Sequence, residues 1–195
     1  MKKRAVFLDR DGTINEDVGY PDSFERIKIY PYSYEAVRKI NNAGLLAVVI
    51  TNQSGVGRGL IKEKALNVIH EKLKESFQNK SARIDEIYYC PHYSKSSIPE
   101  YRKECLCRKP YPGLALRAAE ELGIDLSKSY FIGDKVEDIL LGVNIQATPV
   151  LVLTGFGNQA RARLEEMKIK PGFVAKDLLN AVNWIIKKKG IETAD

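Results

Sequence analysis

The chain has 195 residues, 44% of them hydrophobic and 29% charged, which fits one globular domain and excludes a disordered chain, a coiled coil or collagen. Its 31 lysines and arginines against 25 aspartates and glutamates give a net charge of +6, which suits either nucleic acid or small phosphorylated compounds as partners. Because the first apolar run ends after four residues at Asp9, far too early for a signal peptide or a membrane span, we expect a cytoplasmic protein that does not associate with membranes.

Short apolar runs alternate with helical patterns along the chain. We expect strands at residues 5–8, 45–50, 84–89, 129–132 and 149–153, and helices at 33–43, 62–79, 112–122, 136–146, 157–167 and 175–188. The strands are mostly apolar on both faces, as in sheets that helices cover on both sides. This alternation predicts one α/β domain over residues 1–195, with a doubly wound, mainly parallel, Rossmann-like sheet.

Two stretches, residues 12–32 and 90–111, follow predicted strands and lack a regular pattern. Loops after strand ends line the ligand crevice of an open parallel sheet, so both stretches are expected to serve function. Both are too short to form a large cap domain.

Two carboxylates follow the first strand. Asp9 stands at its end and Asp11 two residues later, with Gly12 allowing a sharp turn. A first carboxylate can act as a covalent nucleophile while a second transfers protons to the leaving group and from water. The same sequence is also common in turns, so the pair alone does not establish this chemistry.

The ends of the next three strands carry further polar residues. These are, in chain order, the hydroxyl and amide residues Thr51, Asn52, Gln53 and Ser54, the cations Arg108 and Lys109, and the acidic residues Asp134 and Asp138 around Lys135. Phosphoryl transfer needs an in-line nucleophile, Mg²⁺ held by oxygen ligands, and positive groups on the phosphoryl oxygens. The four strand ends together supply that set.

In this order the residues resemble the four motifs of the haloacid dehalogenase superfamily of phosphatases, over about residues 4–155. The motifs here are Asp9-Arg10-Asp11-Gly12-Thr13, Thr51, Lys109 and Gly133-Asp134-Lys135 with Asp138. The resemblance implies that Asp9 is the nucleophile and Asp11 the general acid and base. It also implies that Thr51 and Lys109 steady the phosphoryl group.

The same resemblance implies a catalytic Mg²⁺ site. Asp9, Asp134 and the backbone carbonyl of Asp11 would hold the ion. Asp138 would stand behind these ligands or orient Lys109.

All three cysteines and one of the two histidines lie in a loop at about residues 90–107. The segments Cys90-Pro91-His92 and Cys105-Leu106-Cys107 can supply a Cys₃His tetrahedron for a structural Zn²⁺. The loop has too few apolar residues to order itself, so zinc would supply the folding free energy. His70 has no paired ligand in sequence and is expected to be an exposed helix residue without a role.

Within the superfamily, the zinc segments together with residues 9–15 and 51–59 resemble the heptose 1,7-bisphosphate 7-phosphatase family. That resemblance implies removal of the 7-phosphate, leaving heptose 1-phosphate for ADP- or GDP-heptose synthesis in lipopolysaccharide core or S-layer glycans. The substrate contacts it implies are made by Asp17, Val18, Gly19, Tyr20, Asn52, Gln53, Ser54, Arg108 and Lys135.

Three alternatives remain. Histidinol-phosphate phosphatases share the catalytic motifs and a similar zinc loop. A zinc-loop module that binds nucleic acid would use the positive charge, but the cysteine pairs are too closely spaced for a groove-binding finger, and the Asp9 and Asp11 pair would be unused. A polynucleotide-end phosphatase would need a nucleic-acid-binding segment, and none is visible. We expect a monomer that acts on a small sugar bisphosphate and binds no nucleic acid.

Overall fold

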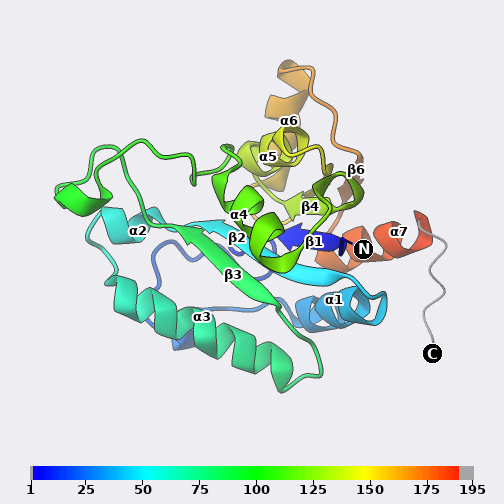
Figure 1. Ribbon diagram of the computed structural model, residues 1–195, viewed down its shortest axis with the longest axis horizontal. Helices are drawn as coiled ribbons and strands as arrows, with labels where there is room; N and C mark the ends of the chain where they lie inside the picture. The colour runs from blue at the N-terminus through cyan, green and yellow to red at the C-terminus, as the bar shows by residue number, and fades with distance from the viewer. Residues whose placement is uncertain (1, 189–195) are drawn as a thin grey trace.

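The computed structural model describes residues 2–188, so Met1 and residues 189–195 of the predicted domain lie outside the described residues. Six parallel strands form one sheet in the order β3-β2-β1-β4-β5-β6 (Figure 1). They are β1 (Ala5–Leu8), β2 (Leu46–Asn52), β3 (Glu86–Cys90), β4 (Tyr130–Gly133), β5 (Thr148–Val152) and β6 (Phe173–Ala175). The strand order reverses between β1 and β4, and ligands bind beyond the strand ends at such a point.

Helices cover both faces of the sheet, as the apolar strands predicted. One face packs on α1 (Pro31–Asn42), α3 (Glu63–Gln78) and α7 (Leu178–Lys188), and the other on α4 (Gly113–Leu122) and α5 (Val136–Asn144). In β1, Val6 and Leu8 belong to the first core while Ala5 and Phe7 belong to the second, as the two-residue period of a strand requires. The predicted doubly wound parallel α/β sheet is therefore confirmed.

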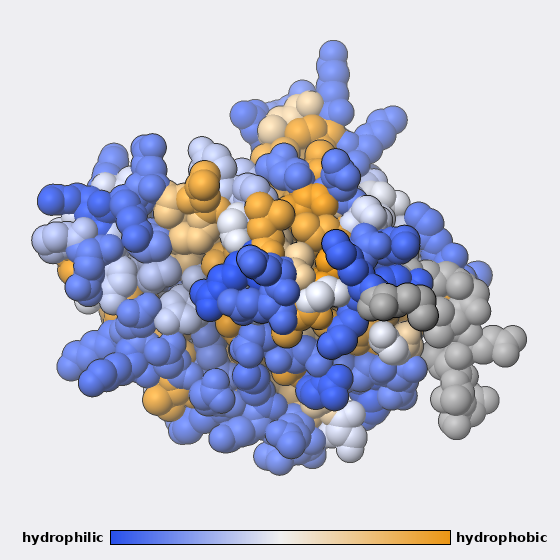
Figure 2. Space-filling model, viewed as in Figure 1, coloured by the Kyte–Doolittle hydropathy of each residue, from blue (hydrophilic) through white to orange (hydrophobic). Residues whose placement is uncertain are grey.

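The remaining helices lie beyond strand ends. The short α2 (Ser54–Gly57) follows β2, and α6 (Gly157–Glu166) follows β5 and packs against α5 through Leu164 and Ile139. No helix of the described chain is long and apolar enough to cross a bilayer. The face drawn in Figure 2 is covered largely by hydrophilic residues.

Several elements differ from the sequence-based prediction, and other bounds shift by one or two residues. The last helix begins at Leu178 instead of residue 175, because 173–175 form the edge strand β6 beside β5. The four-residue α2 was not predicted, since it is too short to show a helical period. The first helix begins at Pro31, a residue suited to the first turn because its missing N–H needs no partner there.

Neither predicted functional loop forms a cap domain in the described chain. The first contains one 3₁₀ turn (Phe24–Arg26), and the second contains another (Pro99–Tyr101). The ends of β1, β2 and β4 therefore stay open to small molecules.

Candidate active site

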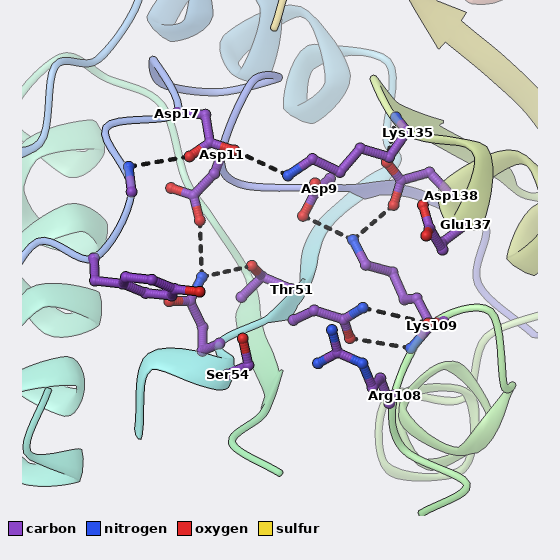
Figure 3. A pocket seen from close by; sticks show the side chains of 14 residues that line it. Asp9, Asp11, Asp17, Thr51, Ser54, Arg108, Lys109, Lys135, Glu137 and Asp138 are labelled. Atoms are coloured by element: carbon purple, nitrogen blue, oxygen red, sulfur yellow. Dashed lines mark hydrogen bonds and ion pairs between the residues drawn. The ribbon is translucent and has the colours of Figure 1, made fainter. Parts of the chain in front are cut away.

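A pocket of about 290 Å³ lies at the ends of β1, β2 and β4 (Figure 3). Its lining consists of Asp9, Asp11, Asp17, Gly19, Tyr20, Thr51, Asn52, Gln53, Ser54, Arg108, Lys109, Lys135, Glu137 and Asp138. The structure thus brings together nearly all residues that the sequence singled out, from segments far apart in the chain. Val18 and the buried Asp134 lie outside this lining, and Glu137 was not predicted.

Lys109 is a buried cation between two carboxylates. Its Nζ lies 2.7 Å from Asp9 Oδ1 and 2.7 Å from Asp138 Oδ1, and it donates a hydrogen bond to the Ile50 carbonyl. Burial alone would lower the pKa of Lys109, but Asp138 and Asp9 outweigh it and raise that pKa. Lys109 is therefore a permanent positive charge directly beside the predicted nucleophile.

Asp134 is completely buried beside Asp9. Its Oδ2 accepts the Phe156 N–H at 2.8 Å, whereas its Oδ1 has no hydrogen-bond partner among residues 2–188. Burial, with Asp9 and Asp138 nearby, raises the pKa of Asp134 to about 8, and burial chiefly raises that of Asp9 to about 6. A buried carboxylate oxygen without a donor is the group that a cation would satisfy.

The residues present fit a hard divalent cation. Ligand oxygens of Asp9, Asp134 and Asp138 lie within 4.8 Å of one another. Asp138 already uses both oxygens, one on Lys109 and the other on the backbone N–H of Lys135, which leaves Asp9 and Asp134 as the available carboxylates. Gly12 gives Asp134 room, because a Cβ there would overlap the Asp134 carboxylate.

Asp11 is held by four donor groups. Arg10 donates from Nε to Oδ1 at 3.0 Å and from Nη2 to Oδ2 at 2.8 Å, while Asn15 and Gln53 each donate one amide hydrogen bond. Burial would raise the pKa of Asp11, but Arg10, Asn15 and Gln53 together lower it. In the free protein Asp11 is therefore an oriented carboxylate at the pocket wall.

Arg10 and Asn15 were not predicted as site residues, and the expectation that His70 is exposed is wrong. His70 is 4% exposed and its Nε2 lies 3.1 Å from Arg10 Nη1. The signal was in the helical period, because His70 falls on the same face of α3 as Leu66, Leu73 and Phe77. Arg10 left no such signal, since a charged residue is expected at the surface.

The amide residues at the end of β2 form hydrogen bonds with other parts of the protein as well as lining the pocket. Asn52 pairs with the backbone of Lys109, accepting its N–H at 3.0 Å and donating to its carbonyl at 3.3 Å. Gln53 bridges Asp11 and the Thr51 hydroxyl through its Nε2, at 2.8 Å from each. Ser54 follows at the first position of α2.

The loop at residues 17–20 closes one side of the pocket. Asp17 forms an ion pair with Lys135 at 3.0 Å and accepts the Gly19 N–H. Tyr20 packs where Gly55 lacks a side chain, since a Cβ on Gly55 would stand 2.7 Å from the ring. Arg108 reaches the pocket from the other loop, and its Nη1 is buried without a hydrogen-bond partner in the described chain.

The second predicted metal cluster is also assembled. The three Sγ atoms lie 2.9 to 3.5 Å apart, and His92 Nδ1 lies 3.1 Å from Cys107 Sγ. These separations are too long for disulfide bonds of about 2.05 Å. They approach about 3.7 Å, which is the separation of two sulfur atoms bound to one tetrahedral Zn²⁺ with Zn–S bonds of about 2.3 Å. The cluster of Cys90, His92, Cys105 and Cys107 therefore fits a four-coordinate Zn²⁺.

Comparisons with known proteins show the family of the chain. Residues 106–181 match a family model described as HAD-hydrolase-like. The chain is 38% identical over 183 residues to the D-glycero-β-D-manno-heptose-1,7-bisphosphate 7-phosphatase of Escherichia coli K12, covering 93% of this chain and 87% of that one. It is 42% identical over 154 residues to the protein of the same name from Pasteurella multocida, covering 78% and 83%.

Solved structures give the same result. The D,D-heptose 1,7-bisphosphate phosphatase of B. bronchiseptica, complexed with magnesium and phosphate, superposes with a TM-score of 0.82 at 29% identity, over 95% of this chain and 99% of that one. The Burkholderia thailandensis enzyme of the same name gives a TM-score of 0.69 at 29% identity, over 94% and 99%. The chain therefore belongs to the D-glycero-D-manno-heptose-1,7-bisphosphate 7-phosphatase family of haloacid-dehalogenase-like hydrolases.

Proposed function

We propose that this protein is a Mg²⁺-dependent phosphatase that removes the 7-phosphate of D-glycero-β-D-manno-heptose 1,7-bisphosphate and leaves the 1-phosphate in place. The observation that carries the proposal is the buried Lys109 between Asp9 and Asp138, at the edge of a pocket that presents two further cations. The β-anomer is taken from the names of the relatives in Escherichia coli and Pasteurella multocida.

In the first step an Asp9 oxygen attacks the 7-phosphorus while the bond from phosphorus to the sugar oxygen breaks. The electron pair goes to that oxygen, which takes a proton from Asp11. The four donors around Asp11 favour its carboxylate form, so the proton must be taken up as the anionic substrate enters and raises the pKa of Asp11. The phosphoryl group is then bonded to the Asp9 oxygen as a phospho-aspartyl intermediate, and the sugar alcohol leaves.

In the second step water attacks the same phosphorus, and Asp11 accepts a proton from that water. The bond between phosphorus and the Asp9 oxygen breaks, which restores the Asp9 carboxylate and releases inorganic phosphate. Lys109 and the Thr51 hydroxyl stabilise the charge on the phosphoryl oxygens in both steps. Mg²⁺ bound by Asp9, Asp134 and the Asp11 carbonyl would add positive charge at the same oxygens.

We propose that Arg108 and Lys135 recognise the rest of the substrate. In Figure 3 they approach the pocket from two sides, Lys135 beside Asp17 and Arg108 below Lys109. The buried Nη1 of Arg108 lacks a protein partner in residues 2–188, and a second phosphate would supply one. Histidinol phosphate carries an amine instead, which these cations would repel.

The decisive experiment offers the purified protein heptose 1,7-bisphosphate, heptose 7-phosphate and histidinol phosphate in separate assays. We expect the highest kcat/KM for the bisphosphate, with heptose 1-phosphate as the product by phosphorus NMR. Equal or faster turnover of histidinol phosphate would replace the proposed substrate while leaving the catalytic residues as proposed.

We further propose that the Cys90, His92, Cys105 and Cys107 cluster holds a structural Zn²⁺, and that the enzyme works as a cytoplasmic monomer. Three unpaired thiols suit a reducing compartment. Size-exclusion chromatography with light scattering tests the monomer, which a mass near twice 22.0 kDa would contradict.

A further inference from the structure

Arg10 is a charged side chain with no exposed surface, and it lies between two partners. On one side its Nε and Nη2 hold both oxygens of Asp11, at 3.0 and 2.8 Å. On the other side its Nη1 lies 3.1 Å from Nε2 of His70, which comes from α3, sixty positions later in the chain. The three side chains form one buried row that ends at the pocket wall.

The chemistry of arginine fixes the direction of the second contact. A guanidinium has five N–H donors and no acceptor, so Nε2 of His70 must accept the hydrogen bond and the ring proton must lie on Nδ1. Burial, with the Arg10 charge close by, lowers the pKa of His70 to about 3, which keeps the ring neutral. His70 therefore supplies Arg10 with a directed acceptor and no charge.

Core packing alone does not explain a histidine here. The same face of α3 carries Leu66, Leu73 and Phe77, all completely buried. Leucine at position 70 would match these neighbours but would leave an Arg10 donor buried without a partner. A buried donor without a partner turns toward another acceptor or toward water. The Arg10 side chain would then reorient and would no longer hold the Asp11 carboxylate in place.

We propose that His70 is a positioning residue, which orients Arg10 and through it holds the Asp11 carboxyl in place for proton transfer to the leaving group. The proposal rests on the proposed function, in which Asp11 supplies that proton. His70 does not line the pocket, so its effect reaches the reaction through Arg10.

If His70 positions Asp11 in this way, the effect of losing His70 on the rate of the first step should depend on the leaving group. A sugar alcohol leaves as an unstable alkoxide unless Asp11 protonates it as the bond from phosphorus breaks. p-Nitrophenol leaves as a stable anion and needs no proton in this step. Misplacing Asp11 should therefore slow the first step for the sugar phosphate and leave it nearly unchanged for p-nitrophenyl phosphate.

The experiment measures the first-turnover rate of leaving-group release, kcat and KM for both substrates in His70→Leu, His70→Gln and a control, Leu73→Ala. Leucine removes the acceptor, whereas the glutamine carbonyl can stand near the position of Nε2 and accept from Arg10. Leu73→Ala weakens the same helix without touching Arg10. Thermal unfolding is recorded for every variant.

For His70→Leu we expect first-turnover release from the heptose bisphosphate to fall about tenfold. KM and the first-turnover release of p-nitrophenolate should change less than about twofold. His70→Gln should recover most of the loss, and Leu73→Ala should leave the ratio between the two substrates unchanged. Equal losses on both substrates, no loss, or no recovery with glutamine would overturn the positioning role.

A replacement variant and the activity of the wild-type protein separate the possible causes of a negative result. If His70→Leu does not fold, His70→Asn replaces it with the same expectations, because the shorter amide cannot reach Arg10. Wild-type protein inactive on the heptose bisphosphate but active on other alkyl phosphates contradicts the proposed substrate alone, and an alkyl phosphate then serves for the comparison. Wild-type protein inactive on every phosphate ester contradicts the proposed function and the positioning role with it.

Discussion

The side-chain amide of Asn52 pairs with the backbone of Lys109 as a neighbouring strand would. Its Oδ1 accepts the Lys109 N–H at 3.0 Å and its Nδ2 donates to the Lys109 carbonyl at 3.3 Å. The end of β2 thereby holds the loop that carries both Arg108 and Lys109. The amide of Asn52 thus holds a cation in place, in addition to any contact with substrate.

Replacing Asn52 with alanine should therefore impair catalysis through Lys109. We expect kcat to fall about tenfold, because both backbone hydrogen bonds that fix the Lys109 backbone are lost. Steady-state kinetics check this, with Asn67→Ala on the outer side of α3 as a control. Loss of substrate affinity with an unchanged kcat would assign Asn52 to substrate binding instead.

Asp9→Asn should abolish turnover while keeping the fold. Asparagine has the shape of aspartate but lacks the anionic oxygen that attacks phosphorus, so we expect a loss of at least about a thousandfold. Circular dichroism and phosphate release are the measurements. Lys109 keeps its ion pair with Asp138 in this variant, which favours a folded protein. Appreciable turnover by Asp9→Asn would contradict a nucleophilic Asp9.

Stability and magnesium binding should depend on pH through Asp134. Its pKa is raised to about 8 in the folded protein, above its usual 3.8, so the folded state binds the proton more tightly than the unfolded state. For the metal-free protein, stability from this group is greatest below about pH 4 and falls as pH rises toward 8.

Mg²⁺ reverses that trend, because it needs the carboxylate and must displace the proton. We expect saturating Mg²⁺ to raise Tm more at pH 8 than at pH 6, and calorimetry to detect proton release on binding near pH 6. Asp134→Asn should lose both effects. A Tm increase that is equal at the two pH values would contradict the linkage.

Cys105→Ser should release zinc and disorder the loop at residues 90–107. Few apolar residues anchor the loop, with Tyr101 packed on Val56, Ile61 and Leu66, so ligand loss removes its main source of folding free energy. Elemental analysis and hydrogen exchange are the measurements, and kcat should fall because Arg108 and Lys109 follow the last ligand. Leu106→Ala is the matched control, since Leu106 lies between two ligands but is 72% exposed. A zinc-free protein with full activity would contradict the architectural role.

Arg108→Ala should reduce the preference for a bisphosphate over a monophosphate. The wild-type enzyme should show a higher kcat/KM for heptose 1,7-bisphosphate than for heptose 7-phosphate, because the monophosphate leaves the buried Nη1 of Arg108 unpaired. The variant should reduce the ratio of the bisphosphate kcat/KM to the monophosphate kcat/KM about tenfold. Arg58→Ala is the control, because Arg58 stacks on Tyr93 outside the pocket lining. An unchanged ratio in Arg108→Ala would remove Arg108 from recognition of the second phosphate.

The alternation of apolar runs and helical periods was enough to predict the doubly wound sheet. These signals are local, since each strand or helix repeats its pattern within its own length. The edge strand β6 and the short α2 carry too few residues to repeat a pattern, and both were missed.

The site residues at strand ends were equally accessible to sequence analysis. Parallel strands place their carboxyl ends at one edge, so Asp9, Thr51 and Asp134 were expected to meet there without knowledge of any side-chain contact. The zinc cluster followed from the spacing of four ligand residues.

Only the tertiary structure decided what surrounds these residues. The contacts from Arg10 to His70 and from Asn52 to Lys109 join positions sixty and fifty-seven residues apart, and no local period encodes them. Whether a histidine or an arginine is buried depends on which partner the fold brings to it, because burying a polar group is costly unless a distant residue completes its hydrogen bonds. The sequence therefore determined which groups could perform the chemistry, and the packing of α3 and the zinc loop on the sheet decided which residues hold them in place.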